Sequence, residues 1–390
     1  MADSVPSEVR GFGCLYEEFD EDFFSQVVRE YAVSLLTMAV ERYPQMLRPD
    51  ATSALSLLTS PHAAEYSPFW CPELAQCLAA LRSPDPPKAA RGVGQILLNL
   101  SCSGAPGDWA IYLGQPSRLR WGHFLLPEAE AVEVQSDGRH ALLKARTGGD
   151  TRALSLRAAG APGLWHGPDA ETIPRLAARD SSILLLTGRL LEQLDLPRPE
   201  FPPLDEITPS QMENVSSCLS FLREHFPPCS LWIERVLRYL CLVRSPPDCM
   251  HSGSFEGHFG FTFMTDRHDP VKLAEMLIHE CSHQYFSLLT RFAALTDDDG
   301  RLYYSPFVRK ERPAERILLA YHAFANVELF YRACVRAGVS VSRSKDAIEQ
   351  LRPDLDLVER ALVSDVSFTP FGRCVMDSLL VNRSRYELTD

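Results

Sequence analysis

The stretch LIHECSHQYF, residues 277–286, constrains this 390-residue chain more than any other, because it contains the pattern HExxH. Residues four apart lie on one face of a helix, so His279 and His283 point the same way and can bind one ion through their ring nitrogens. Glu280 lies about 100° round the helix from His279, close enough to reach an open position on that ion. The pattern therefore predicts a metal site on a helix.

The residues around the motif also favour a helix. Asp269 is a suitable N-cap, Pro270 suits the first helical position, and apolar residues recur at helical spacing to about residue 294. The preceding run HFGFTFMT, residues 258–265, alternates phenylalanines as a strand does. We therefore expect a strand directly before the motif helix. This strand is also a candidate edge for binding an extended peptide.

A catalytic metal site of this kind needs three protein ligands and an open position. The next helical segment is predicted from Pro313 to a glycine stop at Gly338, and it contains His322, the only histidine after the motif. His322 is thus the candidate third ligand, with Glu328 in reserve, although an amphipathic helix can also hold a histidine in its core. The longer peptidase pattern HExxHxxGxxH is absent, because Phe286 stands where its glycine belongs.

Three histidines do not choose the metal, because imidazole binds zinc, iron, copper and nickel alike. The neighbouring charges are more informative. Four cations crowd the lead-in to the second helix: Arg309, Lys310, Arg312 and Arg316. Arginines beside a metal suit a dianionic co-substrate, since a guanidinium binds a carboxylate through two hydrogen bonds. The alternative is an ordinary solvated run of charges.

Composition narrows the classes of partner. The net charge of −12 argues against general binding to nucleic acid or to anionic membranes, both of which need a basic face. The 11 cysteines are odd in number and form no CxxC pair, so we expect reduced thiols. No membrane-spanning run occurs, and the acidic first residues do not resemble a secretory signal. We therefore expect a cytoplasmic protein.

The chain is predicted to be an α+β protein, predominantly helical around its metal site, with a small antiparallel sheet. Residues 1–104 form an N-terminal helical region, including an amphipathic helix over 21–43. Residues 105–165 contain short alternating runs and the hairpin signal Asp137-Gly138, which indicate the antiparallel sheet. Residues 166–390 form the HExxH catalytic domain, in which 211–226 and 230–243 both have helical periodicity.

The region from about 210 to 385 resembles the 2-oxoglutarate-dependent HExxH-type peptide β-hydroxylases, which modify ribosomally made precursor peptides. The resemblance is loose elsewhere in the chain. It is carried by HSGS and GFTFMT before the motif helix, LAEMLIHECSH, YYSPFVRKERP with a helical histidine nine residues after its proline, and TPFGR at 369–373.

This resemblance implies non-haem Fe(II), 2-oxoglutarate and O₂, and hydroxylation at the β-carbon of a residue in a precursor peptide. His279, His283 and His322 match the iron ligands. Arg309 and Arg312 match the arginines before the third ligand, and Arg312 is our first candidate for holding the distal carboxylate of 2-oxoglutarate. Many iron oxygenases use two histidines and one carboxylate instead, so Glu280 can be a ligand, a partner of a ligand or a base.

Two other classes of protein stay open. In a zinc metallopeptidase the same histidines bind zinc, Glu280 is the general base for a bound water, and Arg312 or Tyr321 steadies the oxyanion. In a non-enzymatic binding protein the HExxH pattern is accidental. That reading predicts that Arg309, Arg312 and His322 lie far from the motif.

Overall fold

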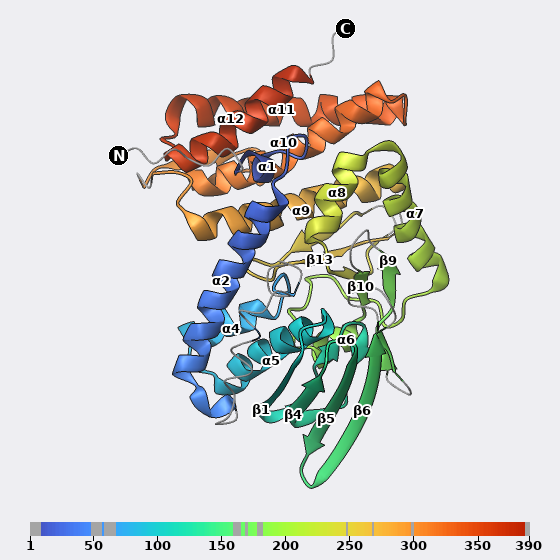
Figure 1. Cartoon of the computed structure of the whole chain (residues 1–390). Coiled ribbons are helices and arrows are strands. Elements are labelled where there is room, and N and C mark those ends of the chain that lie inside the picture. The colour runs from blue at the N-terminus through green and yellow to red at the C-terminus, as the bar shows by residue number, and fades with distance from the viewer. Residues whose placement is uncertain are drawn as a thin grey trace.

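A computed structural model describes residues 9–47, 57, 68–158, 165–167, 171–177, 182–246, 249–266, 269–297 and 300–386. It confirms the predicted α+β class. A layer of helices lies at one end of the molecule, an antiparallel sheet lies at the other, and a second sheet lies between them (Figure 1). Within the described residues, no helix is both long and apolar enough to cross a membrane.

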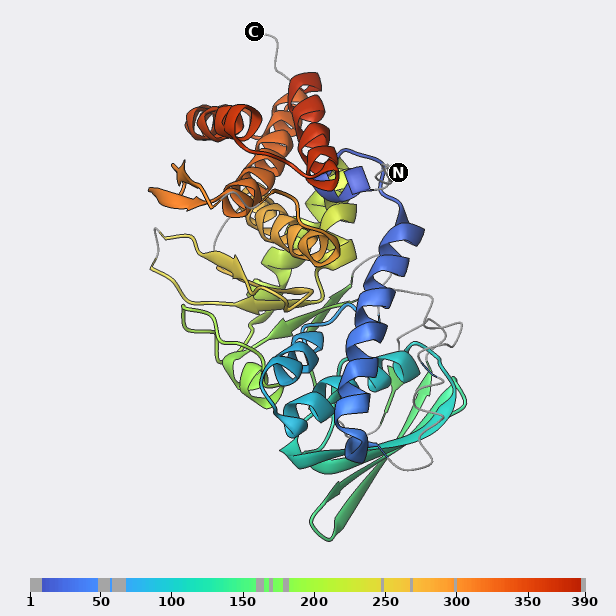
Figure 2. The same cartoon turned by 90° about the vertical axis from the view of Figure 1, so that its left-hand side faces the viewer.

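The amphipathic helix predicted at 21–43 is present as α2. Helix α2 is capped by the Asp20 side chain, which accepts a hydrogen bond from the amide of Phe23. It runs along the side of the molecule from the helical end towards the antiparallel sheet (Figure 2). The elements of the N-terminal region are α1 (Arg10–Gly13), α2 (Glu21–Arg42), the 3₁₀ helix η2 (Pro44–Met46), α4 (Leu74–Arg82) and α5 (Pro86–Cys102).

A five-stranded antiparallel sheet follows α5, in the order β1-β4-β5-β6-β7. The Asp137-Gly138 signal correctly marks the turn between β4 and β5, and Gly138 adopts a φ of 86°. The strands are β1 (Gly107–Ser117), β4 (Ala129–Ser136), β5 (His140–Thr147), β6 (Asp150–Ala158) and β7 (Trp165–His166). A smaller sheet joins β2 (Arg120–Trp121), β3 (Phe124–Leu125) and β8 (Glu171–Thr172).

The central sheet has the order β12-β13-β11-β10-β9. Its inner strands β10, β11 and β13 are parallel, and β9 and β12 are antiparallel at its two edges. The strands are β9 (Arg175–Ala177), β10 (Ser182–Leu186), β11 (Tyr239–Leu242), β12 (Ser252–Ser254) and β13 (Phe261–Met264).

Two expectations about this sheet were wrong. The run 230–243 is not one helix, because helix α8 ends at Val236 and strand β11 begins at Tyr239. All four residues of β11 are buried, and a strand buried on both faces has a continuous apolar sequence that periodicity cannot distinguish from a helix. The strand expected at 258–265 is shorter, and it lies inside the sheet between β11 and β12. The edge is β12.

The motif helix and the helix after it agree with the sequence. Asp269 caps α9 by accepting hydrogen bonds from the amides of Val271 and Lys272. Helix α10 begins after Pro313 and ends before Gly338, whose φ is 71°. The helices of this part are α6 (Gly188–Gln193), α7 (Pro209–His225), α8 (Pro227–Val236), α9 (Pro270–Phe292), α10 (Ala314–Arg336), α11 (Val341–Asp365) and α12 (Pro370–Arg385), with the hairpin β14 (Leu302–Ser305) and β15 (Lys310–Pro313) before α10.

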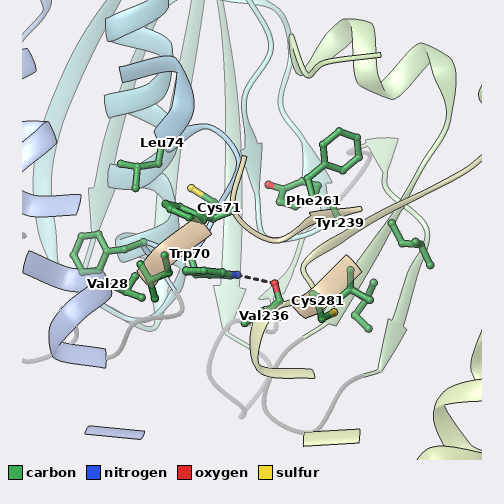
Figure 3. Packing of buried hydrophobic residues seen from close by; sticks show 14 of the residues in the cluster. Val28, Trp70, Cys71, Leu74, Val236, Tyr239, Phe261 and Cys281 are labelled. Atoms are coloured by element: carbon green, nitrogen blue, oxygen red, sulfur yellow. Dashed lines mark hydrogen bonds between the residues drawn. The ribbon is translucent and has the colours of Figure 1, made fainter. Parts of the chain in front are cut away.

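One buried cluster of apolar side chains joins the N-terminal region to the central sheet. Trp70 donates a hydrogen bond from its indole nitrogen to the carbonyl of Val236 (2.6 Å), and both residues lie among the packed side chains of Figure 3. The Trp70 ring also stacks on Phe259, with ring centres 4.6 Å apart. The residues that precede the motif helix are therefore held by the N-terminal part of the chain.

Candidate metal centre

His279 and His283 converge as the HExxH spacing predicts. Helix α9 buries its apolar stripe and leaves these two rings partly exposed, with their Nε2 atoms 3.1 Å apart. Two metal–nitrogen bonds of about 2.1 Å that meet at roughly 90° to 110° would separate their nitrogens by about 3.0 to 3.4 Å. The pair therefore fits two neighbouring ligands of one ion.

Both rings favour the neutral form that binds metal. Burial lowers the pKa of His279 to about 4. The pKa of His283 is held well below its ordinary value, mainly by burial and then by the positive charges of His279, His322 and Arg316. A histidine that is neutral near pH 7 need not lose a proton to bind a metal ion. The helix thus presents two ready imidazole ligands.

Glu280 lies beside the pair, with its side chain directed to the edge strand of the central sheet. Ser252 on β12 donates a hydrogen bond to Oε1 of Glu280 (2.7 Å), and Ser254 on the same strand also bonds to the carboxylate. The other oxygen, Oε2, is buried and has no partner among the described residues. Burial raises the pKa of Glu280 to about 7, although the two serine hydroxyls oppose that rise. The carboxyl group is thus anchored through Oε1, while its buried Oε2 has no hydrogen-bond partner among the described residues.

Strand β12 is shaped by its only glycine. Gly253 pairs with Phe263 on β13, and a Cβ at Gly253 would lie 2.3 Å from the Phe263 ring. Side chains alternate along a strand, so Gly253 faces away from the direction of Ser252 and Ser254. Packing of Phe263 against the glycine therefore brings β12 close to β13 while both serines reach towards α9.

His322, the candidate third ligand, lies on α10 and is fully buried. Its Nε2 is 3.0 Å from the carbonyl oxygen of Phe12, so Nε2 donates a hydrogen bond and Nδ1 is left as an acceptor with no partner among the described residues. Asn326 holds the same N-terminal segment by bonding to the amide of Leu15 and the carbonyl of Gly13. His322 is close enough to affect the pKa of His283, and burial lowers its own pKa to about 4.

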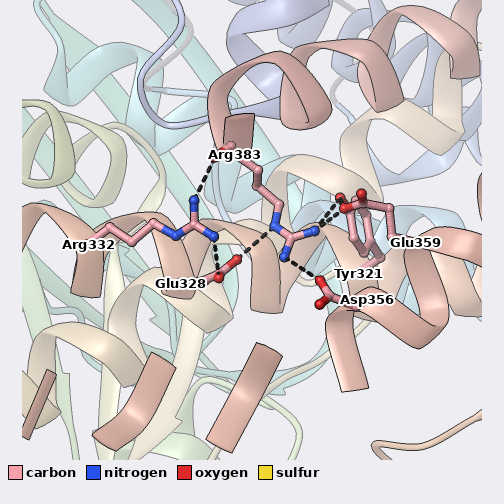
Figure 4. A network of polar contacts seen from close by, with 6 residues as sticks. All are labelled: Tyr321, Glu328, Arg332, Asp356, Glu359 and Arg383. Atoms are coloured by element: carbon pink, nitrogen blue, oxygen red, sulfur yellow. Dashed lines mark hydrogen bonds and ion pairs between the residues drawn. The ribbon is translucent and has the colours of Figure 1, made fainter. Parts of the chain in front are cut away.

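Among the residues that the structure describes, no three His, Cys, Asp or Glu side chains lie close enough together to hold an ion. The described residues therefore supply two histidine ligands for a metal ion. The assignment of His322 as the third ligand stays a prediction. The reserve candidate, Glu328, is engaged elsewhere. Its two carboxylate oxygens pair with Arg332 (2.6 Å) and Arg383 (2.7 Å) (Figure 4).

The hairpin β14–β15 contacts the motif indirectly, through one aromatic ring in its turn and one on α10. Phe307, in the turn, stacks on Phe324 of α10 with ring centres 4.1 Å apart, and the Phe324 ring lies edge-on to His279 at 4.7 Å. Arg309 is exposed and has a φ of 52°, while Arg312 is partly buried in the extended strand β15, as predicted. Neither arginine forms an ion pair with another described residue.

The cation that influences the motif is Arg316, since its charge lowers the pKa of His283. The Arg316 side chain pairs with Glu256, and Arg291 of α9 pairs with the same carboxylate. The sequence singled out Arg316 only as one of four cations. It singled out Ser252 and Ser254 only within the HSGS segment that carries the resemblance, and it gave no signal for Glu256, because these residues reach the motif through sheet pairing and a loop rather than through helical spacing.

Comparison of the sequence with protein-family models and with curated proteins finds no match to either. The likeness to the peptide β-hydroxylases therefore rests on the motif residues alone. Chemically, the described site offers two neutral imidazoles, one carboxyl group with a free oxygen, a sheet edge and nearby guanidinium groups. This set suits a metal ion together with an anionic or peptide ligand.

Proposed function

We propose that this protein is an Fe(II)- and 2-oxoglutarate-dependent oxygenase that hydroxylates the β-carbon of a residue in a ribosomally made peptide. The observation that supports it best is the pair of neutral imidazoles, with Nε2 atoms 3.1 Å apart, beside a guanidinium that acts on His283. Metal ligands next to cations suit a co-substrate that carries a keto acid at one end and a second carboxylate at the other. A peptidase has no need of that second anion.

In this proposal His279 and His283 hold the iron, with His322 as the predicted third ligand. Bound iron would supply the activation of O₂, with 2-oxoglutarate as co-substrate. The protein contributes binding, orientation and exclusion of water. Phe307 and Phe324 cover one side of His279 and limit solvent there. The hydroxyls of Ser252 and Ser254 fix the orientation of Glu280 beside the pair.

Peptide is the proposed substrate class because β12 is an edge strand adjacent to the motif. Its free side can pair with an extended chain through backbone hydrogen bonds, which holds a peptide without requiring one particular side chain. The hydrogen bond from Ser252 to Glu280 shows how near this edge is to the histidines. A cytoplasmic location also belongs to the proposal, since all eleven cysteines, Cys14 through Cys374, are free thiols.

A zinc metallopeptidase is the second candidate, and the free oxygen of Glu280 favours it. A buried carboxyl group with a pKa raised to about 7 and one unpartnered oxygen is suited to take a proton from water near pH 7. This chemistry would use the same two histidines. It assigns no role to an anionic co-substrate.

Anaerobic reconstitution separates the two candidates. The full-length protein is loaded with Fe(II), 2-oxoglutarate is added, and the visible absorption of the keto acid chelate is recorded. We expect the band to appear in wild type and in Glu280→Gln, and to be lost in His279→Ala. Absence of the band in iron-loaded wild type, together with peptide cleavage by the zinc form that Glu280→Gln abolishes, would establish the peptidase instead.

A further inference from the structure

Glu256, Arg291 and Arg316 form a cluster beside the motif that the metal chemistry does not use. The three residues come from the loop after β12, from α9 and from α10. Oxygen Oε1 of Glu256 lies 3.6 Å from Arg291, and oxygen Oε2 lies 3.1 Å from Arg316. Two guanidinium groups on different helices therefore hold one carboxylate between them.

This cluster is open to solvent on the side of its carboxylate. The Glu256 side chain is 64% exposed and that of Arg316 is 48% exposed, whereas that of Arg291 is only 19% exposed. The Nε atom of Arg291 is buried and has no hydrogen-bond partner among the described residues. Ion pairs with this much exposure are weak, so Glu256 is held weakly. Arg291 is the least exposed member of the cluster and Glu256 the most exposed.

The cluster also lies near the histidine pair. Arg316 lies on α10, which also carries His322 and Phe324, and the ring centre of Phe324 is 4.7 Å from that of His279. Arg291 follows His283 by eight residues on α9 (291 − 283), which is about 12 Å along the helix axis. The two arginines therefore lie on the same two helices as His283 and His322.

We propose that Arg291 and Arg316 form a carboxylate-binding site, in which Glu256 is an internal occupant that an external carboxylate displaces. The exchange breaks two ion pairs and forms two, and no bond is made or oxidised. Two sources of carboxylate fit this chemistry, the far end of a small dicarboxylate and the C-terminus of a peptide. Identifying the dicarboxylate with 2-oxoglutarate rests on the proposed function, and it moves the anion clamp from Arg312 and Arg309 to this pair.

The geometry gives Glu256 a specific role as a competitor. An internal carboxylate near the arginines lowers the apparent affinity for an external one by the fraction of time it occupies the site. Removing its charge while keeping its shape, as in Glu256→Gln, should therefore strengthen anion binding. A purely structural ion pair would behave in the opposite way, since its loss could only loosen the site.

The test uses the full-length, metal-free protein and calorimetric titration with glutarate, a dicarboxylate that lacks the keto group. We expect Arg316→Gln and Arg291→Gln each to weaken binding at least tenfold, in line with the loss of a charged hydrogen bond. Glu256→Gln should tighten binding severalfold. Arg360→Gln, the same change on the exposed face of α11, is the matched control and should leave binding unchanged. Circular dichroism of each variant checks that it is folded.

Two further titrations identify the ligand and test Arg312 as the alternative anion-binding residue. Triglycine with a free C-terminus is compared with triglycine amide, and selective binding of the free acid assigns the site to peptide C-termini if glutarate does not bind. Arg312→Gln is titrated with glutarate in parallel, and we expect no weakening. The proposal is overturned if Arg312→Gln weakens binding while Arg316→Gln does not, or if neither wild type nor Glu256→Gln binds any of the three probes.

Failure of the carboxylate site can be distinguished from failure of the proposed function. If the glutarate pattern holds but iron-loaded protein shows no 2-oxoglutarate chelate band, the oxygenase proposal fails while the carboxylate site stands. If the band forms and is unaffected by Arg316→Gln and Arg291→Gln, the identification of this site with the 2-oxoglutarate clamp fails while the oxygenase proposal stands, and the carboxylate site itself is then decided by the titrations with glutarate and triglycine.

Discussion

Two clusters in this protein are built from the same parts, one glutamate held by two arginines, and they differ mainly in burial. In the sealed cluster, Glu328 is fully buried, and the side chains of Arg332 and Arg383 are 3% and 7% exposed. In the open cluster around Glu256, the carboxylate is 64% exposed. The chemistry of the groups is therefore the same, and the surroundings decide what each cluster can do.

The sealed cluster continues into a network of further ion pairs. Arg383 also pairs with Asp356 and Glu359 of α11, and Tyr321 donates a hydrogen bond to Glu359, so α10, α11 and α12 are tied together (Figure 4). Buried ion pairs are costly to break, because the charge that remains is left without a partner and without solvent. In the open cluster, solvent can replace Glu256, and so can a solute carboxylate. Exposure thus separates a structural ion pair from a candidate binding site.

The largest expected effect comes from making the same substitution in both clusters. Glu328→Gln leaves two buried guanidinium groups without their shared counter-charge and should lower the free energy of unfolding by about 3 to 5 kcal/mol. Glu256→Gln should change it by less than about 1 kcal/mol. Urea unfolding at pH 7 measures both. Similar losses in the two variants would show that burial does not distinguish the clusters.

Glu280 sharpens the comparison, because it is buried like Glu328 but its partners in the described part of the chain are serine hydroxyls rather than arginines. Its pKa is raised to about 7 in the folded protein from an ordinary value of 4.5, so the folded state holds its proton more tightly than the unfolded state. This contribution to stability is fully present below about pH 4.5 and is lost as the pH rises to about 7, by about 3 kcal/mol in all.

Glu280→Gln removes this titration. We therefore expect the stability of the variant relative to wild type to increase by up to about 3 kcal/mol between pH 4.5 and pH 7.5, measured by urea unfolding of metal-free protein with a chelator present. His279, His283 and His322 titrate in the same range in both proteins, and their effects cancel in the difference. A difference that stays flat across this range would show that Glu280 has an ordinary pKa.

The sequence predicted those parts of the site that depend on residues close together in the chain. The Asp269 cap, the His279 and His283 pair and the extended backbone at Arg312 depend on neighbours in sequence, and all three are found as predicted. Strand β11 was missed because a strand buried on both faces has no period of its own.

The contacts that distinguish the two clusters were beyond sequence analysis for a different reason. Glu328 appeared to be a reserve metal ligand, because nothing in its helix reveals that Arg383, 55 residues later, occupies it. Glu256 meets Arg316 across 60 residues, and Ser252 meets Glu280 across 28. Such pairings depend on how helices and strands pack, and a single sequence carries no pattern for them.

A smaller effect is expected at the anchor of Glu280. Ser252→Ala removes one hydrogen bond to a buried carboxyl group, and we expect a loss of about 1 kcal/mol in the free energy of unfolding at pH 7. Ser252→Thr keeps the hydroxyl and should retain most of that stability. Equal losses in both variants would attribute the effect to packing of β12 against β13 rather than to the hydrogen bond.

The smallest effect concerns Arg309, which has no carboxylate partner among the residues that the structure describes and so differs from the arginines of both clusters. Its φ of 52° is in the left-handed region, where a side chain costs about 1 kcal/mol and glycine costs nothing. Glycine also makes the unfolded chain more flexible, which offsets part of the gain. Arg309→Gly should therefore raise the free energy of unfolding by no more than about 0.5 kcal/mol, and a precise comparison of thermal midpoints is needed to detect it.

The same variant should bind glutarate as wild type does, because Arg309 lies on the hairpin and not in the pair that holds Glu256. A tenfold loss of glutarate binding in folded Arg309→Gly would return the anion clamp to the hairpin and remove the contrast between the open cluster and the sealed one.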